Sequence, residues 1–258
     1  MSSNHVMRLR YQRILLFKPD LTPVVAGKLR QNLLDEENLD YASPSVMEVM
    51  LDSALEQNLT LMASRTAERM IADYPETDMA LDARMVLAKQ ALEKARDPEV
   101  STSAAAELFK KAEQHLTIIK DVYATSGGAA EALLLLGGIY REQKKFDQAQ
   151  QCYDSVLGVK AWRPSWPEAL YGLGLCAEAK KDWVKATAYY ERIYVMYNNY
   201  RVWTAKAYLR RAECLMQLYH EAKAKETLAE FLSQEALKQL PEYEQGVKLR
   251  AKLEGKGL

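Results

Sequence analysis

The sequence predicts an all-α fold, an α-solenoid built from stacked antiparallel helix pairs. One segment pattern recurs in register, with an alanine at its centre and apolar residues four and seven positions later. Its three clear copies and one degenerate copy are Phe109-x-x-Ala112-x-x-x-Leu116-x-x-Ile119, Phe146-x-x-Ala149-x-x-x-Tyr153-x-x-Val156, Trp183-x-x-Ala186-x-x-x-Tyr190-x-x-Ile193 and Thr60-x-x-Ala63-x-x-x-Ala67-x-x-Met70. Ala149 and Ala186 are 37 residues apart, which is the period of a helix-turn-helix repeat. The alternating apolar pattern of strands is absent. Arrays of this kind usually provide a binding surface.

Helices are predicted in chain order from apolar spacing and from capping residues. Thr22-Pro23 opens a helix, because proline is favoured in the first helical turn. Ser45-x-x-Glu48 and Ser165-x-x-Glu168 have the spacing of capping boxes and open two further helices. Another helix ends before Asp97-Pro98, since the residue before a proline is biased away from helical geometry. The predicted helices span residues 6–17, 23–37, 45–57, 60–73, 78–95, 101–124, 129–143, 146–158, 166–180, 183–197, 203–218, 221–232 and 241–254.

A small residue recurs at one position in the first helix of each pair. Leu136-Gly137 and Leu173-Gly174 are the clear copies, and Leu87-Ala88 and Arg211-Ala212 are variants. Glycine inside a helix is unfavourable by roughly 1 kcal/mol relative to alanine, so its recurrence indicates that the partner helix comes too close for a Cβ. Aromatic residues of the second helix are expected to fill the space between units.

These residues resemble the tetratricopeptide repeat (TPR) family. The family pattern, Leu-Gly-x-x-Tyr followed by aromatic-x-x-Ala-x-x-x-aromatic, stands here as Leu136-Gly137-x-x-Tyr140 and Phe146-x-x-Ala149-x-x-x-Tyr153. A second copy runs from Leu173 to Tyr190. The segment from Tyr74-Pro75 to Leu87-Ala88 looks like the subtype found in bacterial cell-envelope assembly factors. The resemblance covers about residues 44–238 and implies a right-handed superhelix of helix pairs.

Three features depart from the family pattern. The period is 37 to 38 residues rather than 34. Lys144 and Lys181 stand where the family has a glycine between the helices, and Arg211 replaces an apolar residue. Helix pairs tolerate loop extensions of a few residues, so these departures bear on the subtype more than on the fold.

The chain is expected to comprise three parts. Residues 1–43 form N-terminal flanking helices, in which residues 7–17 resemble the second helix of an earlier unit. Residues 44–240 form an array of about five helix pairs, and residues 241–258 form a charged capping helix. Ala88 to Ala112 spans 24 residues where Gly137 to Ala149 spans 12, which places an insertion near 93–104. The insertion either lengthens an antiparallel pair or forms a projection that contacts a partner.

The amino-acid composition argues against some classes of function and bears on the cellular compartment. The 258 residues include 35 basic and 35 acidic side chains, and this balance argues against general attraction to nucleic-acid phosphates. No 18-residue apolar run is present, so no membrane span is expected. Residues 1–10 lack the apolar core of a signal peptide. The sequence as it stands favours a cytoplasmic location, or a periplasmic one if a leader has been removed.

The residue types that carry most catalytic and metal chemistry are scattered, which predicts that the protein is not an enzyme. They are His5, His115, His220, Cys152, Cys176 and Cys214. No pair of them has the spacing of a metal site, and the cysteines are expected to be small core residues. Gly127-Gly128 lacks the Lys-Ser/Thr of a phosphate-binding loop. We expect no catalytic residue, no metal and no cofactor.

The resemblance also implies where a partner binds. In TPR arrays the first helix of each unit lines a concave groove, and the residue three before the Gly/Ala position points into it. That position is occupied by Met85, Leu134, Tyr171 and Leu209. The position one after the small residue is occupied by Lys89, Gly138, Leu175 and Glu213, and the position four after it by Leu92, Arg141, Glu178 and Met216. Members that bind chaperones clamp a C-terminal carboxylate with Lys and Asn, and Leu134 with Gly138 cannot do this because they offer no cation or amide donor.

An apolar stripe with a charged rim predicts that the partner is another protein or peptide. Such a groove suits an amphipathic helix or an extended apolar segment. Two alternatives remain at the level of sequence. The stripe is covered by the chain's own helices, since large exposed apolar patches are uncommon in monomers. Or the protein is a structural subunit of a larger, envelope-associated assembly in which its faces are permanently buried.

Overall fold

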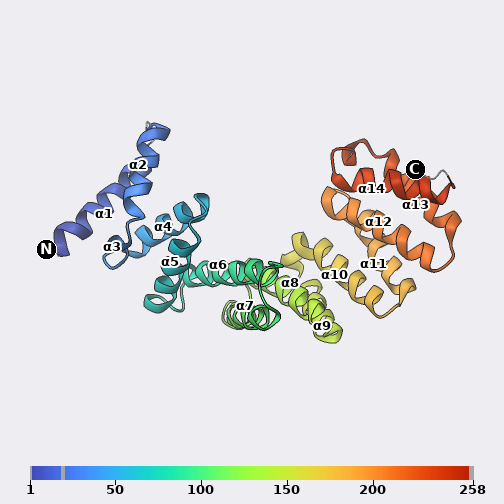
Figure 1. Ribbon diagram of the computed structural model, residues 1–258, viewed down its shortest axis with the longest axis horizontal. Coiled ribbons are helices and arrows are strands. Elements are labelled where there is room, and N and C mark those ends of the chain that lie inside the picture. The colour runs from blue at the N-terminus through green and yellow to red at the C-terminus, as the bar shows by residue number, and fades with distance from the viewer. Residues whose placement is uncertain (1, 19–20, 256–258) are drawn as a thin grey trace. The chain divides into compact units, whose positions relative to one another are not determined.

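The computed structural model describes residues 2–18 and 21–255, and every regular element in that part of the chain is a helix (Figure 1). This confirms the predicted all-α fold of successive helix pairs. The chain divides into two compact units, residues 1–129 and 130–258. None of the described helices is both long and apolar enough to cross a lipid bilayer.

Unit 1 is built from α1 to α7 around a core of leucine, methionine and alanine. Its helices are α1 (Ser2–Leu16), α2 (Pro23–Leu33), α3 (Glu36–Leu39), α4 (Pro44–Glu56), α5 (Thr60–Asp73), α6 (Asp78–Ala95) and α7 (Thr102–Val122). The buried side chains of α4, α5 and α6 include Met47, Met50, Met70 and Ala83. Large thioether side chains next to small alanines allow the helices of consecutive pairs to pack closely.

Unit 2 contains most of α8 and all the helices that follow it. These are α8 (Gly127–Glu142), α9 (Phe146–Leu157), η1 (Lys160–Ser165), α10 (Trp166–Ala179), α11 (Trp183–Met196), α12 (Arg201–Gln217), α13 (Glu221–Ser233), η2 (Glu235–Leu237) and α14 (Pro241–Leu253). Its core is aromatic, because Tyr190, Tyr208 and Phe231 are fully buried and the rings of Tyr208 and Phe231 stack with centroids 5.5 Å apart. Successive helices therefore meet through rings rather than through aliphatic side chains.

The recurring glycines of unit 2 lie under these rings. A Cβ on Gly137 would lie 2.6 Å from the Tyr153 ring, and a Cβ on Gly174 would lie 2.4 Å from the Tyr190 ring. Both distances are shorter than any real Cβ contact, so the two positions require glycine as the sequence predicts. Gly172 was not predicted to have this role. A Cβ on Gly172 would lie 2.4 Å from the same Tyr153 ring, so this ring of α9 also packs against α10, the first helix of the following pair.

Four first helices end in the same hydrogen-bonded turn. Asn58, Lys144, Lys181 and Tyr219 have positive φ values of 56° to 60°, in the left-handed region. After each, the next N–H donates to the carbonyl oxygen five residues back, as in Lys145 N to Tyr140 O at 2.7 Å and Asp182 N to Ala177 O at 2.9 Å. This is the Schellman motif, which normally has glycine at the left-handed position. Lysine therefore keeps the family's turn geometry without its usual residue.

Replacing these lysines by glycine is expected to stabilise the protein. An L-residue in the left-handed region costs about 1 to 2 kcal/mol, and the entropy of glycine in the unfolded chain offsets part of the relief. Lys144→Gly and Lys181→Gly should each raise the free energy of unfolding by about 0.5 to 1 kcal/mol. Urea denaturation measures the change. Lys145→Gly is the matched control, because Lys145 has an ordinary φ of −87° and should gain nothing. Equal effects at Lys144 and Lys145 would contradict the explanation.

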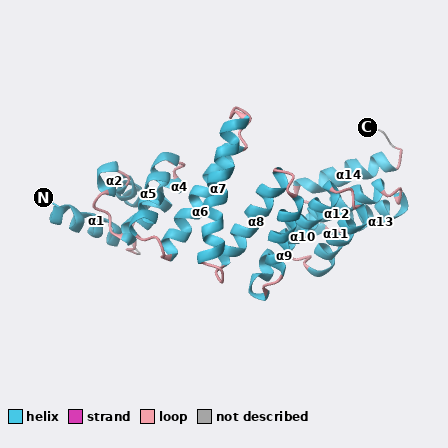
Figure 2. Ribbon diagram, turned by 90° about the horizontal axis from the view of Figure 1, so that it is seen from below, coloured by secondary structure: helices cyan, strands magenta, loops and turns pink. Residues whose placement is uncertain are grey.

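The predicted insertion lies at the far end of the pair formed by α6 and α7. Residues 93–104 comprise the last turn of α6, the connecting turn and the start of α7. The two helices have 18 and 21 residues and pack along each other. Figure 2 shows this hairpin extending beyond α4 and α5. The extra residues thus lengthen an antiparallel pair.

Two predicted caps and two predicted helix boundaries are wrong. The helix predicted to begin at residue 6 begins at Ser2. The helix expected from Ser45 begins at Pro44, and its N-cap is Ser43. Ser165 precedes α10 but its side chain caps no backbone N–H, because the η1 turn already holds it in helical geometry. The helix predicted to reach residue 37 ends at Leu33, and the short helix α3 follows it. By contrast, Thr22 caps α2 as expected, since its hydroxyl accepts from Val25 N at 3.5 Å.

Candidate partner-binding surface

Equivalent positions of the first helices in unit 2 lie side by side. Glu131, Glu168 and Lys206 stand at one repeat position of α8, α10 and α12. Burial raises the pKa of Glu168, the neighbouring Glu131 carboxylate adds to this, and Lys206 acts in the opposite direction. Such interactions require the three side chains to be close together. The side chains at this one repeat position therefore influence one another across α8, α10 and α12.

The predicted apolar row is mostly covered by the chain itself. Leu134 is 8% exposed and Leu209 is 7% exposed. Tyr171 is half-buried, with its ring centroid 5.5 Å from that of Tyr190 and 5.4 Å from that of Trp203. Met85, on α6 of unit 1, is also buried. These burial values favour the alternative in which the stripe is packed against neighbouring helices. The apolar row forms the floor of the surface and offers little free apolar area.

Gly138 leaves an open place in this surface. A Cβ built there meets no atom within 4 Å, whereas one built on the preceding Gly137 would collide with a ring. Leu175 and Arg141, the neighbouring predicted groove residues, are partly exposed. A partner could therefore approach the backbone of α8 at Gly138, because no side chain of the protein covers that position.

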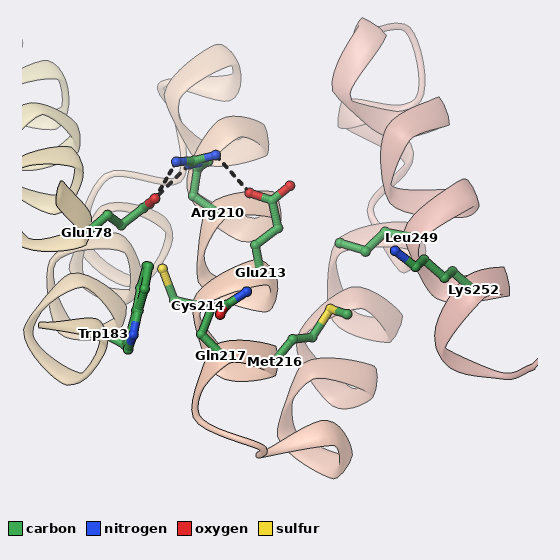
Figure 3. Close-up of a pocket in the computed structure, with 9 residues that line it drawn as sticks. All are labelled: Glu178, Trp183, Arg210, Glu213, Cys214, Met216, Gln217, Leu249 and Lys252. Atoms are coloured by element: carbon green, nitrogen blue, oxygen red, sulfur yellow. Dashed lines mark hydrogen bonds and ion pairs between the residues drawn. The ribbon is translucent and has the colours of Figure 1, made fainter. Parts of the chain in front are cut away.

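A pocket of unit 2 is lined by residues of α10, α11, α12 and α14 (Figure 3). Its volume is about 420 Å³. Apolar walls come from Trp183, Cys214, Met216 and Leu249. Polar walls come from Glu178, Arg210, Glu213, Gln217 and Lys252. A volume of this size accepts one or two side chains of a partner rather than a whole helix.

An ion network forms the wall of this pocket between α10 and α12. Arg210 donates through Nε to Glu178 Oε1 at 3.0 Å, through Nη2 to Glu178 Oε2, and through Nη1 to Glu213 Oε2 at 2.9 Å. Tyr190 donates its hydroxyl to Glu178 Oε1 at 2.6 Å. Burial lowers the pKa of Arg210, but the carboxylates of Glu178 and Glu213 outweigh it and raise that pKa. The bidentate pair holds the guanidinium in one orientation and joins two repeats.

The network does not activate the cysteine beside it. Burial raises the pKa of the Cys214 thiol, and Glu178 raises it further. The thiol is therefore neutral near pH 7 and is a poor nucleophile. Among the described residues, no three His, Cys, Asp or Glu side chains could together hold a metal ion. What the pocket offers is apolar contact, hydrogen bonding and charge.

The pocket brings together three of the predicted groove residues, Glu178, Glu213 and Met216. Arg210, Trp183, Leu249 and Lys252 were missed. The last two come from α14, whose charged residues suggest only a capping role. Gly246 is the residue that could have indicated that α14 also packs as a repeat helix and lines the pocket. A Cβ there would lie 2.7 Å from the Phe231 ring. Gly172 of α10 lies in the same way against the ring of the preceding helix, and Leu249 follows Gly246 by about one turn.

Comparison with known proteins finds tetratricopeptide repeats in unit 2. Two models of this repeat match the sequence, one over residues 132–165 and the other over residues 168–197. No curated protein matches it.

Solved structures of repeat proteins share the fold. A thermophilic TPR protein of Thermus thermophilus is 19% identical with a TM-score of 0.53, over 84% of this chain and 100% of that chain. A tetratricopeptide repeat protein of Parabacteroides merdae is 15% identical with a TM-score of 0.57, over 99% of this chain and 94% of that one. The pilF protein of Pseudomonas aeruginosa is 18% identical with a TM-score of 0.53, over 87% and 90%. At these identities the similarity concerns the fold alone.

Proposed function

Because the chain belongs to the tetratricopeptide repeat family, we propose that it is a non-catalytic scaffold whose first helices bind a segment of a partner protein. TPR repeats generally mediate protein–protein interactions, and proteins built from them are typically non-catalytic. The partner segment is a helix or an extended apolar segment. It lies along the inner side of α8, α10 and α12 and ends at α14.

The observation that carries this proposal is the pocket at α12 and α14. Trp183, Met216 and Leu249 supply apolar walls on one side, and the Glu178–Arg210–Glu213 network supplies a rigid polar wall on the other. Aromatic and methionine side chains beside an oriented arginine are typical of residues that dominate interface energetics. An apolar side chain of the partner would enter the pocket, while Gln217 and Lys252 would contact its polar groups.

The burial of Leu134 and Leu209 refines where the partner binds. Since these leucines form the floor, the contacts fall on accessible neighbours, namely Gly138, Leu175, Arg141 and Met216. A surface with a covered apolar floor and a mixed rim binds through a few anchors rather than through a continuous apolar stripe. Partner binding should therefore depend on the two ends of the surface, at α8 and at α12.

Bulky side chains added at accessible positions test the proposal without disturbing the core. Gly138→Trp places an indole where no atom of the protein lies within 4 Å of the new Cβ. Gln217→Trp places one at the exposed edge of the pocket. Gln151→Trp, on the exposed side of α9, is the matched control. Each variant is immobilised and used to capture partners from native extract, and its melting temperature is measured in parallel.

We expect Gly138→Trp and Gln217→Trp to lose a protein that the wild type and Gln151→Trp both retain, at unchanged melting temperature. Equal capture by all four proteins would exclude the inner surface as the binding site. If the wild type captures nothing and sediments as a large oligomer, the protein is a structural subunit of an assembly instead.

A further inference from the structure

The outer face of α1 is apolar and lies exposed within the part of unit 1 that the structure describes. Met7, Tyr11 and Ile14 follow one another at i, i+4 and i+7, so they form one stripe along the helix. Each of them is more than half exposed, as is Phe17 just after the helix. The opposite face is packed, since Leu9 is fully buried in the core of the unit. The helices that pack against α1 are α2 and α4.

The N-terminal region has an excess of basic over acidic residues, although the chain as a whole has none. Residues 1–34 contain six basic residues and one acidic residue, whereas the other 224 contain 29 basic and 34 acidic residues. Arg8 and Arg10 are exposed on the two sides of the apolar stripe, and Lys18 and Lys28 are exposed nearby. None of these four makes an ion pair within the described part of the chain. Arg13 packs on the Phe17 ring and Arg30 pairs with Glu56, so they are already engaged.

We propose that the outer face of α1 binds the surface of an anionic lipid bilayer. Apolar and aromatic side chains of an interfacial helix enter the boundary between headgroups and acyl chains, and flanking arginines bind lipid phosphates. The placement of Arg8 and Arg10 on either side of the Met7, Tyr11 and Ile14 stripe fits this geometry. The exposed apolar side chains of α1 are confined to this one stripe, and basic residues flank it.

Lipid is favoured over a protein partner by the shape and charge of this face. It is the convex ridge of a single helix, so a protein would need a matching groove with acidic groups opposite each unpaired cation. A bilayer offers an apolar layer for the stripe and many mobile lipid phosphates for the arginines, so no fixed arrangement of acidic groups is needed. Unlike a membrane-spanning helix, α1 would lie in the interface and remain part of unit 1.

Vesicle flotation tests the proposal with the full chain. The probes are vesicles of phosphatidylcholine and vesicles of phosphatidylcholine mixed with phosphatidylglycerol. The protein should float only with the anionic vesicles, and less so at high salt. The double variant Arg8→Glu/Arg10→Glu should reduce partitioning at least about tenfold, since each basic residue near the surface contributes to it. Met7→Ser/Ile14→Ser should also reduce it, because the apolar anchor is lost.

The control is Lys110→Glu/Lys111→Glu on α7, which removes two exposed basic residues elsewhere in unit 1 and should leave flotation unchanged. Melting temperatures check that all variants are folded. Absence of binding to anionic vesicles, or equal loss in the α7 variant, would overturn the proposal. If the wild type does not bind vesicles, two effects of Arg8→Glu/Arg10→Glu would show that another partner occupies this face. Conversion of an oligomer to a monomer would identify a second copy as the occupant, and loss of a captured protein would identify an acidic partner.

Discussion

Gly174→Leu is expected to destabilise the protein by about 2 to 3 kcal/mol, the upper part of the range for overpacking a core. A Cβ at this position would lie 2.4 Å from the Tyr190 ring, and the ring cannot move aside easily. Tyr190 is fully buried and its hydroxyl is held by Glu178 at 2.6 Å. Leucine is the better helix former by just under 1 kcal/mol, which offsets only part of the loss. The Glu178–Arg210 pair should be disturbed as well, because Tyr190 shares its carboxylate.

Chemical denaturation of the wild type and the variant measures this loss. Gly138→Leu is the matched control, since the same substitution is made one repeat earlier, in α8, at a glycine with open space. It should keep or slightly increase stability. Equal losses in the two variants would mean that the effect comes from glycine replacement in general and not from the contact with Tyr190.

Leu134→Glu is expected to cost about 3 kcal/mol or more, because it places a carboxylate without a cation in a buried position. The sequence alone left open whether this leucine lines an accessible groove or is covered by the chain's own helices. The structure shows it only 8% exposed. The loss should become smaller at low pH, since a buried carboxyl has a raised pKa and its protonation removes the unpaired charge.

Thermal unfolding at neutral and acidic pH tests this expectation. Leu134→Met, which keeps volume and polarity, should cost less than about 1.5 kcal/mol. If Leu134→Glu unfolds at the wild-type temperature, the residue is accessible, and the apolar row is open to a ligand after all. The result also decides how binding experiments are read, because partner loss in a destabilised variant says nothing about the contact surface.

The sequence by itself determined most of the helices, the repeat register and two of the glycines that lie under rings, Gly137 and Gly174. These features are periodic and local: apolar spacing sets the buried side of each helix, and a small residue at constant offset marks a close approach. The turns also follow from local chemistry. Lys144 and Lys181 adopt the left-handed geometry of the glycine they replace because the two hydrogen bonds of the motif hold the backbone there.

Only the tertiary structure decided which groove positions are accessible and where a pocket forms. Leu134 and Gly138 are one helical turn apart, yet one is covered and the other is open. Arg210 joins Glu178 to Glu213, and Leu249 and Lys252 reach the pocket from α14. Accessibility depends on the side chains that neighbouring helices place opposite a position. The spacing within one helix contains no information about those side chains, so the repeat pattern locates the surface but not the residues that remain free on it.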